Sequence, residues 1–251
     1  MGSGESRPLV HALALAAALL SFACGGVLGP RYEYEEELYL SLDGSGTVNV
    51  NASIPALVAL RGADLNVDPR ARLDRAAIRR LFAGRGVELV RLSDSRRDGR
   101  RFVHVTLDVE DVRQLSRVAP FSWSTYNLHD RGSAYEYRQV VAAAAAKPVE
   151  DVGWTGDELV AFRLHIPSEI PWHNSAEPPQ RGNILVWEQP LRDRIEGVPL
   201  DLQVAMEPQS ILYSTLILFA STIVAAAVTF AVVIWLVARR GRHVAAAESV
   251  P

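Results

Sequence analysis

The feature that most constrains this chain is an uncharged stretch near its C-terminus, residues 211–237. A helix needs about 20 predominantly apolar residues to cross the hydrocarbon core of a bilayer, and this stretch exceeds that length. Tyr213 and Trp235 lie near its ends, where amphipathic rings prefer the membrane interface. Three basic residues follow it directly: Arg239, Arg240 and Arg242. The sequence therefore predicts a single transmembrane helix over 211–237, with the bilayer as a partner and a short cytoplasmic tail at 238–251.

The N-terminus has the pattern of an export signal. Arg7 precedes an apolar run over 9–22 that is short for a membrane span, so residues 1–23 are expected to be a signal peptide. Cleavage there leaves Cys24, the single cysteine of the chain, as the first residue, which is similar to a bacterial lipoprotein leader. The usual lipoprotein pattern has Leu at position −3, whereas Leu20 stands at −4. Two interpretations stay open: a lipidated Cys24, or an ordinary or uncleaved leader with an incidental cysteine.

The composition excludes several classes of protein. Its charged fraction of 22% and mean hydropathy of +0.07 fit neither a disordered chain nor a polytopic transporter. One cysteine rules out an internal disulfide scaffold and a cysteine-based metal finger. A pI near 6.1 argues against a nucleic-acid partner. The length of 251 residues corresponds to one or two domains.

Between the two membrane signals, apolar residues alternate with polar ones in the manner of β-strands. A first hairpin is expected over 33–52, turning at Asp43-Gly44-Ser45-Gly46, with Glu33, Glu35, Glu36 and Glu37 as a solvated face. A second hairpin pairs 87–92 with 102–109. Further strands are expected at 121–128, 135–141, 159–166, 184–188 and 198–206.

Two helices are expected among these strands. The first begins at Asp68-Pro69 and ends at Gly84, and the second begins at Glu110-Asp111 with acidic residues at its positive end. The order predicts an α+β fold in which antiparallel sheets carry two helices on one face, plus the C-terminal transmembrane helix. Residues 31–141 form the α+β extracytoplasmic domain in this prediction, and 149–208 form a mainly β extension of it.

The whole arrangement resembles the LppM-like family of exported bacterial proteins. The resemblance is carried by the leader, by the turn Leu42-Asp43-Gly44-Ser45-Gly46-Thr47-Val48, and by a late block followed by one membrane helix and a basic stop. That block comprises residues 162–167, His173-Asn174 and residues 182–187. Family members are largely uncharacterised, and glycolipid binding has been proposed for the mycobacterial relative. The resemblance implies a membrane-anchored envelope protein, while the leader and a longer middle insertion depart from the family.

Arginines gather in the first half of the domain. The candidate patch for an anionic ligand comprises Arg75, Arg79, Arg80, Arg96, Arg97, Arg100 and Arg101. A guanidinium binds phosphate in a bidentate manner, so such a patch suits anionic lipid headgroups or an acidic partner. The alternative is a solvated helix face and a polar turn, since the chain uses arginine almost to the exclusion of lysine and nearby aspartates dilute the charge.

A proline-rich loop over 167–182 carries Trp172, His173 and Asn174, which are candidates for the rim of a ligand site. The alternative is that Trp172 only pins the loop. The histidines of the domain are scattered and no nucleophile motif occurs, so we expect no metal, no cofactor and no catalytic site.

Together these observations predict a membrane-anchored extracytoplasmic binding domain in a bacterial cell membrane, with an envelope lipid or an envelope protein as its partner. Two alternatives stay open: a structural or assembly subunit of a membrane complex, and an envelope hydrolase. A lipid binder should have an apolar groove with arginines at its mouth. An assembly subunit should expose an apolar patch, and a hydrolase should have a cleft with converging titratable groups. The oligomeric state is open.

Overall fold

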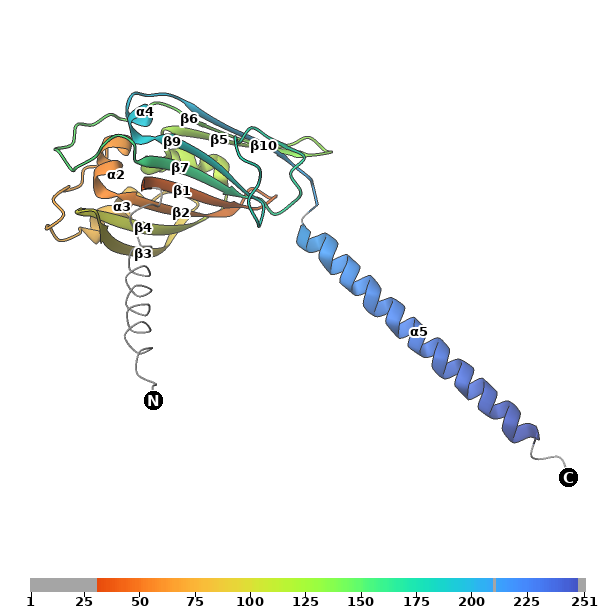
Figure 1. Ribbon diagram of the computed structural model, residues 1–251. Helices are drawn as coiled ribbons and strands as arrows, with labels where there is room; N and C mark the ends of the chain where they lie inside the picture. Colours follow the sequence, from red (N-terminus) through yellow and green to blue (C-terminus); the bar gives the residue numbers. More distant parts are fainter. Residues whose placement is uncertain (1–30, 210, 248–251) are drawn as a thin grey trace, which may run out of the picture.

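The computed structural model describes residues 31–209 and 211–247, and of residues 214 and 237–247 it describes the backbone alone. The predicted signal peptide (1–23), Cys24 and the end of the predicted tail (248–251) therefore lie outside the described residues. So do the side chains of Arg239, Arg240 and Arg242. Two β-sheets make up the domain, and a long helix leaves it at the C-terminal end (Figure 1).

The larger sheet has six strands in the order β3-β4-β2-β1-β7-β9. Their bounds are β1 Tyr32–Leu40, β2 Gly46–Ser53, β3 Val87–Arg97, β4 Arg100–Val109, β7 Leu159–His165 and β9 Ile184–Pro190. Both predicted hairpins are present, as β1–β2 and β3–β4. The pairing of β1 with β7 is parallel, so this sheet is mixed and not antiparallel throughout.

The smaller sheet has four strands in the order β5-β6-β10-β8 and is antiparallel. Their bounds are β5 Ser124–Asp130, β6 Tyr135–Val141, β8 Trp172–His173 and β10 Leu200–Met206. Strands from the late part of the chain thus enter both sheets, with β7 and β9 extending the first and β8 and β10 the second.

The hydrophobic core lies between the two sheets. Buried side chains alternate along β1, where Tyr34, Leu38 and Leu40 face inward, and along β5 and β6, where Tyr126 and Tyr137 face them. The inner face of the six-stranded sheet is therefore covered largely by the second sheet. The predicted arrangement, two helices covering one face of the sheet, is not what these contacts show.

The short helix α2, Ile54–Arg61, was missing from the expected elements. Ser53 caps its start by accepting a hydrogen bond from the Ala56 amide at 3.1 Å, and Gly62 ends it with a φ of 69°. Every residue from Ile54 to Leu60 is buried. A helix that is apolar all round has no amphipathic period, which is why the sequence pattern does not reveal it.

The other helical segments are short. They are α3 Arg75–Leu81, the 3-10 turns η1 Val112–Arg117 and η2 Ala119–Phe121, and α4 Leu191–Ile195. The helix expected from Asp68 starts only at Arg75, because Asp74 is the residue that caps it, accepting from the Ala77 amide at 2.8 Å. The alanine run 142–146, a linker or a short helix from its sequence, has no helical structure.

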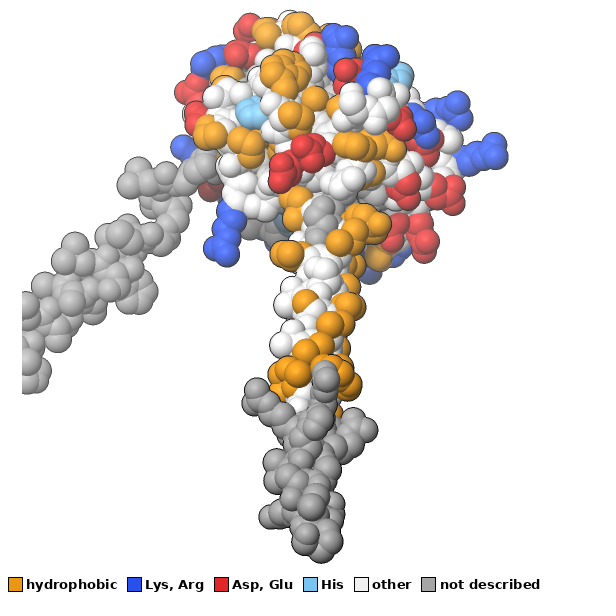
Figure 2. Space-filling view, turned by 90° about the vertical axis from the view of Figure 1, so that its right-hand side faces the viewer, with side chains coloured by type: hydrophobic (Ala, Val, Ile, Leu, Met, Phe, Trp, Pro, Cys, Tyr) orange, Lys and Arg blue, Asp and Glu red, His pale blue; other side chains and the backbone are white. Residues whose placement is uncertain are grey.

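The last element is α5, Ile211–Ala247, which projects away from the domain (Figure 1). Its segment Ile211–Leu236 spans 26 residues with a mean hydropathy of 2.6, so it is long and apolar enough to cross a membrane. Figure 2 shows the contrast with the domain, whose surface mixes basic, acidic and apolar side chains, while the described part of α5 carries no charged ones.

Candidate functional site

The outer face of the six-stranded sheet, the face turned away from the second sheet, is polar. It is built by the residues that alternate with the core positions, for example Glu37 on β1, Asn49 on β2 and Thr106 on β4. The prediction that Glu35 and Glu37 lie on a solvated face agrees with this arrangement. Glu33 and Glu36 are buried instead, at 0% and 3% exposure, and in their case the prediction is wrong.

Hydrogen bonds link these outer side chains across the strands. Thr106 donates to Asn49 at 2.9 Å, Asn49 donates to Glu37 at 3.4 Å, and the Nε2 of His165 on β7 donates to Glu37 at 2.6 Å. This last hydrogen bond outweighs partial burial and lowers the pKa of Glu37. Four strands are thus joined by one chain of side-chain contacts, which holds Glu37 ionised.

At one end of this face lies a cavity of about 830 Å³, which we call the sheet-end cavity. One cross-strand row of residues contributes to it, running from β3 to β7: Glu88, Asp108, Thr47, Tyr39 and His165. Because each neighbouring strand adds about 4.8 Å, the row extends over roughly 19 Å. No single segment of the sequence could have indicated this set, because its members come from five separate strands.

The chemistry of the sheet-end cavity is aromatic and acidic. The Tyr39 ring stacks on the His165 imidazole with 3.9 Å between centroids, and 41% of Tyr39 is exposed. Partial burial and the nearby Glu37 carboxylate raise the pKa of the Tyr39 hydroxyl, so the ring stays a neutral phenol. Glu88, Asp108 and Glu110 add carboxylates, and the described lining contains neither lysine nor arginine.

The sheet-end cavity lies where the chain leaves the domain. Pro167 lines it, and the Pro167 carbonyl accepts a hydrogen bond from the amide of Ile211, the first residue of α5, at 3.0 Å. Figure 1 shows the corresponding ends of β1 and β2 on the side from which α5 departs. A residue that lines the sheet-end cavity is thus hydrogen-bonded to the first residue of the apolar helix.

The predicted arginine patch is divided by the structure. Arg79, Arg80 and Arg96 are exposed, whereas Arg100 and Arg101 are buried, at 4% and 7% exposure. Arg75 and Arg97 are exposed but have partners: Arg75 pairs with Asp94 at 3.4 Å and Arg97 donates to the Tyr32 carbonyl. Ligand binding by these arginines stays a prediction.

The arginines of the β3–β4 hairpin lie far from the start of α5. The strand β3 begins at the sheet-end cavity with Val87 and ends with Arg97, roughly 30 Å away at 3.3 Å per residue. An anionic headgroup in the membrane that α5 is predicted to enter would therefore lie far from these arginines.

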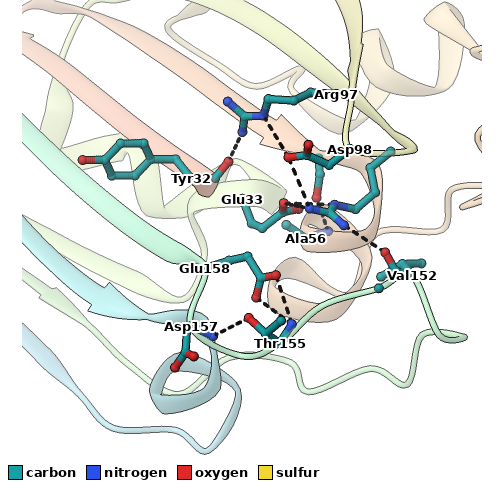
Figure 3. Close-up of polar contacts among 12 residues, drawn as sticks. Tyr32, Glu33, Ala56, Arg97, Asp98, Val152, Thr155, Asp157 and Glu158 are labelled. Atoms are coloured by element: carbon teal, nitrogen blue, oxygen red, sulfur yellow. Dashed lines mark hydrogen bonds and ion pairs between the residues drawn. The ribbon is translucent and has the colours of Figure 1, made fainter. Parts of the chain in front are cut away.

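Arg100 closes the far end of the sheet as part of a buried cluster. Its guanidinium contacts the Glu33 carboxylate at 2.8 and 3.0 Å and donates to the Val152 carbonyl at 2.9 Å (Figure 3). Beside it, Glu158 accepts the amides of Thr155 and Gly156 at 2.9–3.1 Å, and these bonds outweigh burial and lower its pKa. Here Arg100 fastens the loop at 150–158 to the start of β1.

Of the three residues predicted to form a loop rim, one lines a cavity and two make contacts within the fold. Trp172 is 52% exposed and lines a second cavity of about 500 Å³ beside β6 and β10. Asn174 is structural: its Oδ1 accepts from Trp187 at 3.1 Å and from the Gln203 amide at 2.9 Å. His173 pairs with Val204 in the sheet. Only Trp172 of the three presents its side chain to a cavity, and a ligand role for the loop stays a prediction.

Comparison with known proteins does not identify a family for this chain. No family model and no curated protein matches the chain. Among solved structures, it is distantly similar to the NMR structure of the folded domain of LppM from Mycobacterium tuberculosis, with 10% sequence identity and a TM-score of 0.39. That likeness covers 75% of this chain and 97% of the other. Membership of the LppM-like family stays a prediction.

Proposed function

We propose that this chain is a non-catalytic binding domain, anchored in a bacterial cell membrane by α5, whose sheet-end cavity binds the hydroxyl-rich headgroup of an envelope lipid. The observation that carries the proposal is the hydrogen bond between Pro167 and Ile211. Through this bond a residue that lines the sheet-end cavity lies beside the point at which α5 begins. A headgroup at the surface of that membrane is the ligand nearest to such a cavity.

The chemistry of the lining supports a neutral, hydroxyl-rich group. Carboxylates such as Asp108 accept hydrogen bonds from ligand hydroxyls, and the exposed Tyr39 ring offers an apolar surface for the carbon skeleton. A phosphate would meet three carboxylates and neither lysine nor arginine among the described lining residues, which is electrostatically unfavourable. This differs from the apolar groove with arginines that a lipid binder was expected to have.

The alternatives have less support. The large apolar residues exposed on the described domain are Tyr39, Val90, Trp172 and Val198. They are dispersed over several elements, so they form no contiguous apolar patch for an assembly partner. A hydrolase could use the Glu37–His165 pair, but among the described residues no serine or threonine hydroxyl is hydrogen-bonded to His165.

Native mass spectrometry of the full chain, extracted gently from its own host, tests the proposal. We expect a bound lipid that organic solvent removes, whose fragments contain a hydroxyl-rich headgroup. Tyr39→Ala should lose the bound species because the aromatic surface is gone, whereas Val90→Ala, an exposed change outside the cavity, should retain it. A protein mass without lipid, or a lipid retained equally by Tyr39→Ala, would contradict the proposal.

A further inference from the structure

Trp172 is a large apolar side chain exposed to solvent on the proline-rich loop 167–182. It is 52% exposed, whereas Trp187 in the same domain is 6% exposed and belongs to the core. The described domain leaves about half of this residue uncovered. Single exposed apolar residues are common on protein surfaces, so the place of Trp172 in the fold decides what its indole can contact.

The loop that carries Trp172 is fastened to the segment leading into α5. Trp172 pairs with Ala205 on β10, the Glu207 amide donates to the Glu169 carbonyl at 3.0 Å, and the Ile211 amide donates to the Pro167 carbonyl at 3.0 Å. The loop thus follows the chain up to the first residue of the apolar helix. Six residue steps separate Ala205 from Ile211 and the pairing of Trp172 with Ala205 adds about 5 Å, so Trp172 lies within roughly 27 Å of the start of α5.

A bilayer is the partner that fits both observations. Indole rings concentrate at the membrane–water interface, because the ring is apolar and its N–H can bond with water or headgroups. The exposed surface of α5 begins with Ile211 and Leu212, so the apolar surface of the span starts beside this loop. A protein partner would need its own binding surface here, whereas the membrane is adjacent once α5 is inserted.

We propose that Trp172 is a second membrane contact, its indole lying in the headgroup layer of the leaflet that α5 enters. This contact would set the tilt of the domain and keep its cavity-bearing end turned toward the lipid. The inference requires α5 to lie in a bilayer, as in the proposed function, but does not require the sheet-end cavity to be occupied. The two proposals can therefore fail separately.

The test uses the full chain in phosphatidylcholine–phosphatidylglycerol nanodiscs, with a nitroxide quencher attached to the lipid headgroup. Trp235 lies within α5 and would also be quenched, so every sample carries Trp235→Phe. We expect the headgroup nitroxide to quench part of the tryptophan emission, and that part to be lost when Trp172→Phe is added. A nitroxide placed deep in the acyl chains should quench it less.

A matched control moves the indole to the far end of the sheet. Arg96→Trp, in the chain that lacks Trp172 and Trp235, should not restore the quenched component, because Arg96 is exposed near the end of β3 remote from α5. Trp172→Tyr keeps an interfacial ring and checks that the loop still folds, since its circular dichroism should equal that of the parent. Equal quenching with and without Trp172, or restored quenching from Arg96→Trp, would overturn the inference.

Discussion

A carboxylate lies at the centre of the packed interior. Glu36 accepts hydrogen bonds from the hydroxyls of Tyr34 and Tyr126 at 2.9 and 2.8 Å and from Gln139 at 2.8 Å. Its cationic partner is Arg61, 3.5 Å away, whose guanidinium also lies over the Trp123 ring. Burial and the Glu36 charge raise the pKa of the Tyr126 hydroxyl well above its ordinary value, so it remains a donor.

The first prediction concerns the buried pair of Glu36 and Arg61. Glu36→Gln removes the counter-charge of Arg61, whose side chain is 1% exposed, and leaving a buried charge unpaired is strongly destabilising. A loss of about 3 kcal/mol lowers the unfolding midpoint of a domain of this size by roughly 10 °C. Thermal unfolding of the detergent-solubilised full chain, followed by circular dichroism, measures it.

A neighbour on the same strand provides the control. Glu35→Gln alters the half-exposed pair with Arg163 on the outer face and should change the midpoint little. Adding Arg61→Met to Glu36→Gln should recover part of the loss, because the unpaired charge is then removed. Equal midpoints for the two glutamine variants would show that the ion pair does not stabilise the fold.

At the scale of the element, the hydrogen-bonded side chains on the outer face of the six-stranded sheet include a histidine whose contribution to stability depends on pH. The Nδ1 of His104 lies 2.8 Å from the side-chain Oδ1 of Asn51 and its Nε2 lies 2.8 Å from the Ser95 hydroxyl, an arrangement that a neutral imidazole satisfies. Partial burial, aided by the charge of Arg97, lowers the pKa of His104 below 6.5. The folded state therefore prefers the neutral ring.

The second prediction follows from that shift. As pH falls below about 6.5, the unfolded chain binds a proton before the folded chain does, so this contribution to stability is lost on acidification. The unfolding midpoint of the full chain should therefore fall between pH 7 and pH 5, and His104→Gln should flatten that slope. His129→Gln, at an exposed position, is the control and should keep it. A slope unchanged by His104→Gln would contradict the prediction.

Sequence patterns predict the elements of this fold better than their assembly. The β1–β2 and β3–β4 hairpins follow from local alternation and turn residues, which act over a few positions. The parallel pairing of β1 with β7 joins Tyr39 to His165 across most of the domain, and no local signal encodes it. The sheet-end cavity depends on that pairing, so its residues could be identified as outward-facing but not as neighbours. The burial of Glu36 was missed because buried partners come from α2, β5 and β6.

At the scale of the whole molecule, the two ends of the six-stranded sheet carry different sets of residues. The end beside α5 carries the sheet-end cavity and the loop of Trp172, while the end at Arg97 carries the arginines of the β3–β4 hairpin and the Glu33–Arg100 cluster. The orientation of the chain in the membrane decides which side of the bilayer the cavity serves. The positive-inside rule applied to Arg239, Arg240 and Arg242 predicts that the domain lies outside the cell.

The third prediction tests this orientation with thiol labelling. In a Cys24→Ser background, Arg96→Cys should react with a membrane-impermeant maleimide on intact cells. Glu248→Cys should react only after the cells are permeabilised, because we expect the tail to be cytoplasmic. The opposite pattern would reverse the orientation, and labelling of both positions on intact cells would show that α5 does not span the membrane.

The short connection between β10 and α5 has a consequence for how tightly the domain needs to hold its ligand. Five residue steps from Met206 to Ile211 reach at most about 18 Å, so with α5 inserted as proposed the sheet-end cavity would be confined to a thin layer above the bilayer. Short tethers produce effective concentrations in the millimolar range, so a headgroup bound with only millimolar affinity would still occupy the cavity for much of the time. The tether, more than the intrinsic affinity, would then set the occupancy, and exchange between lipids would stay fast.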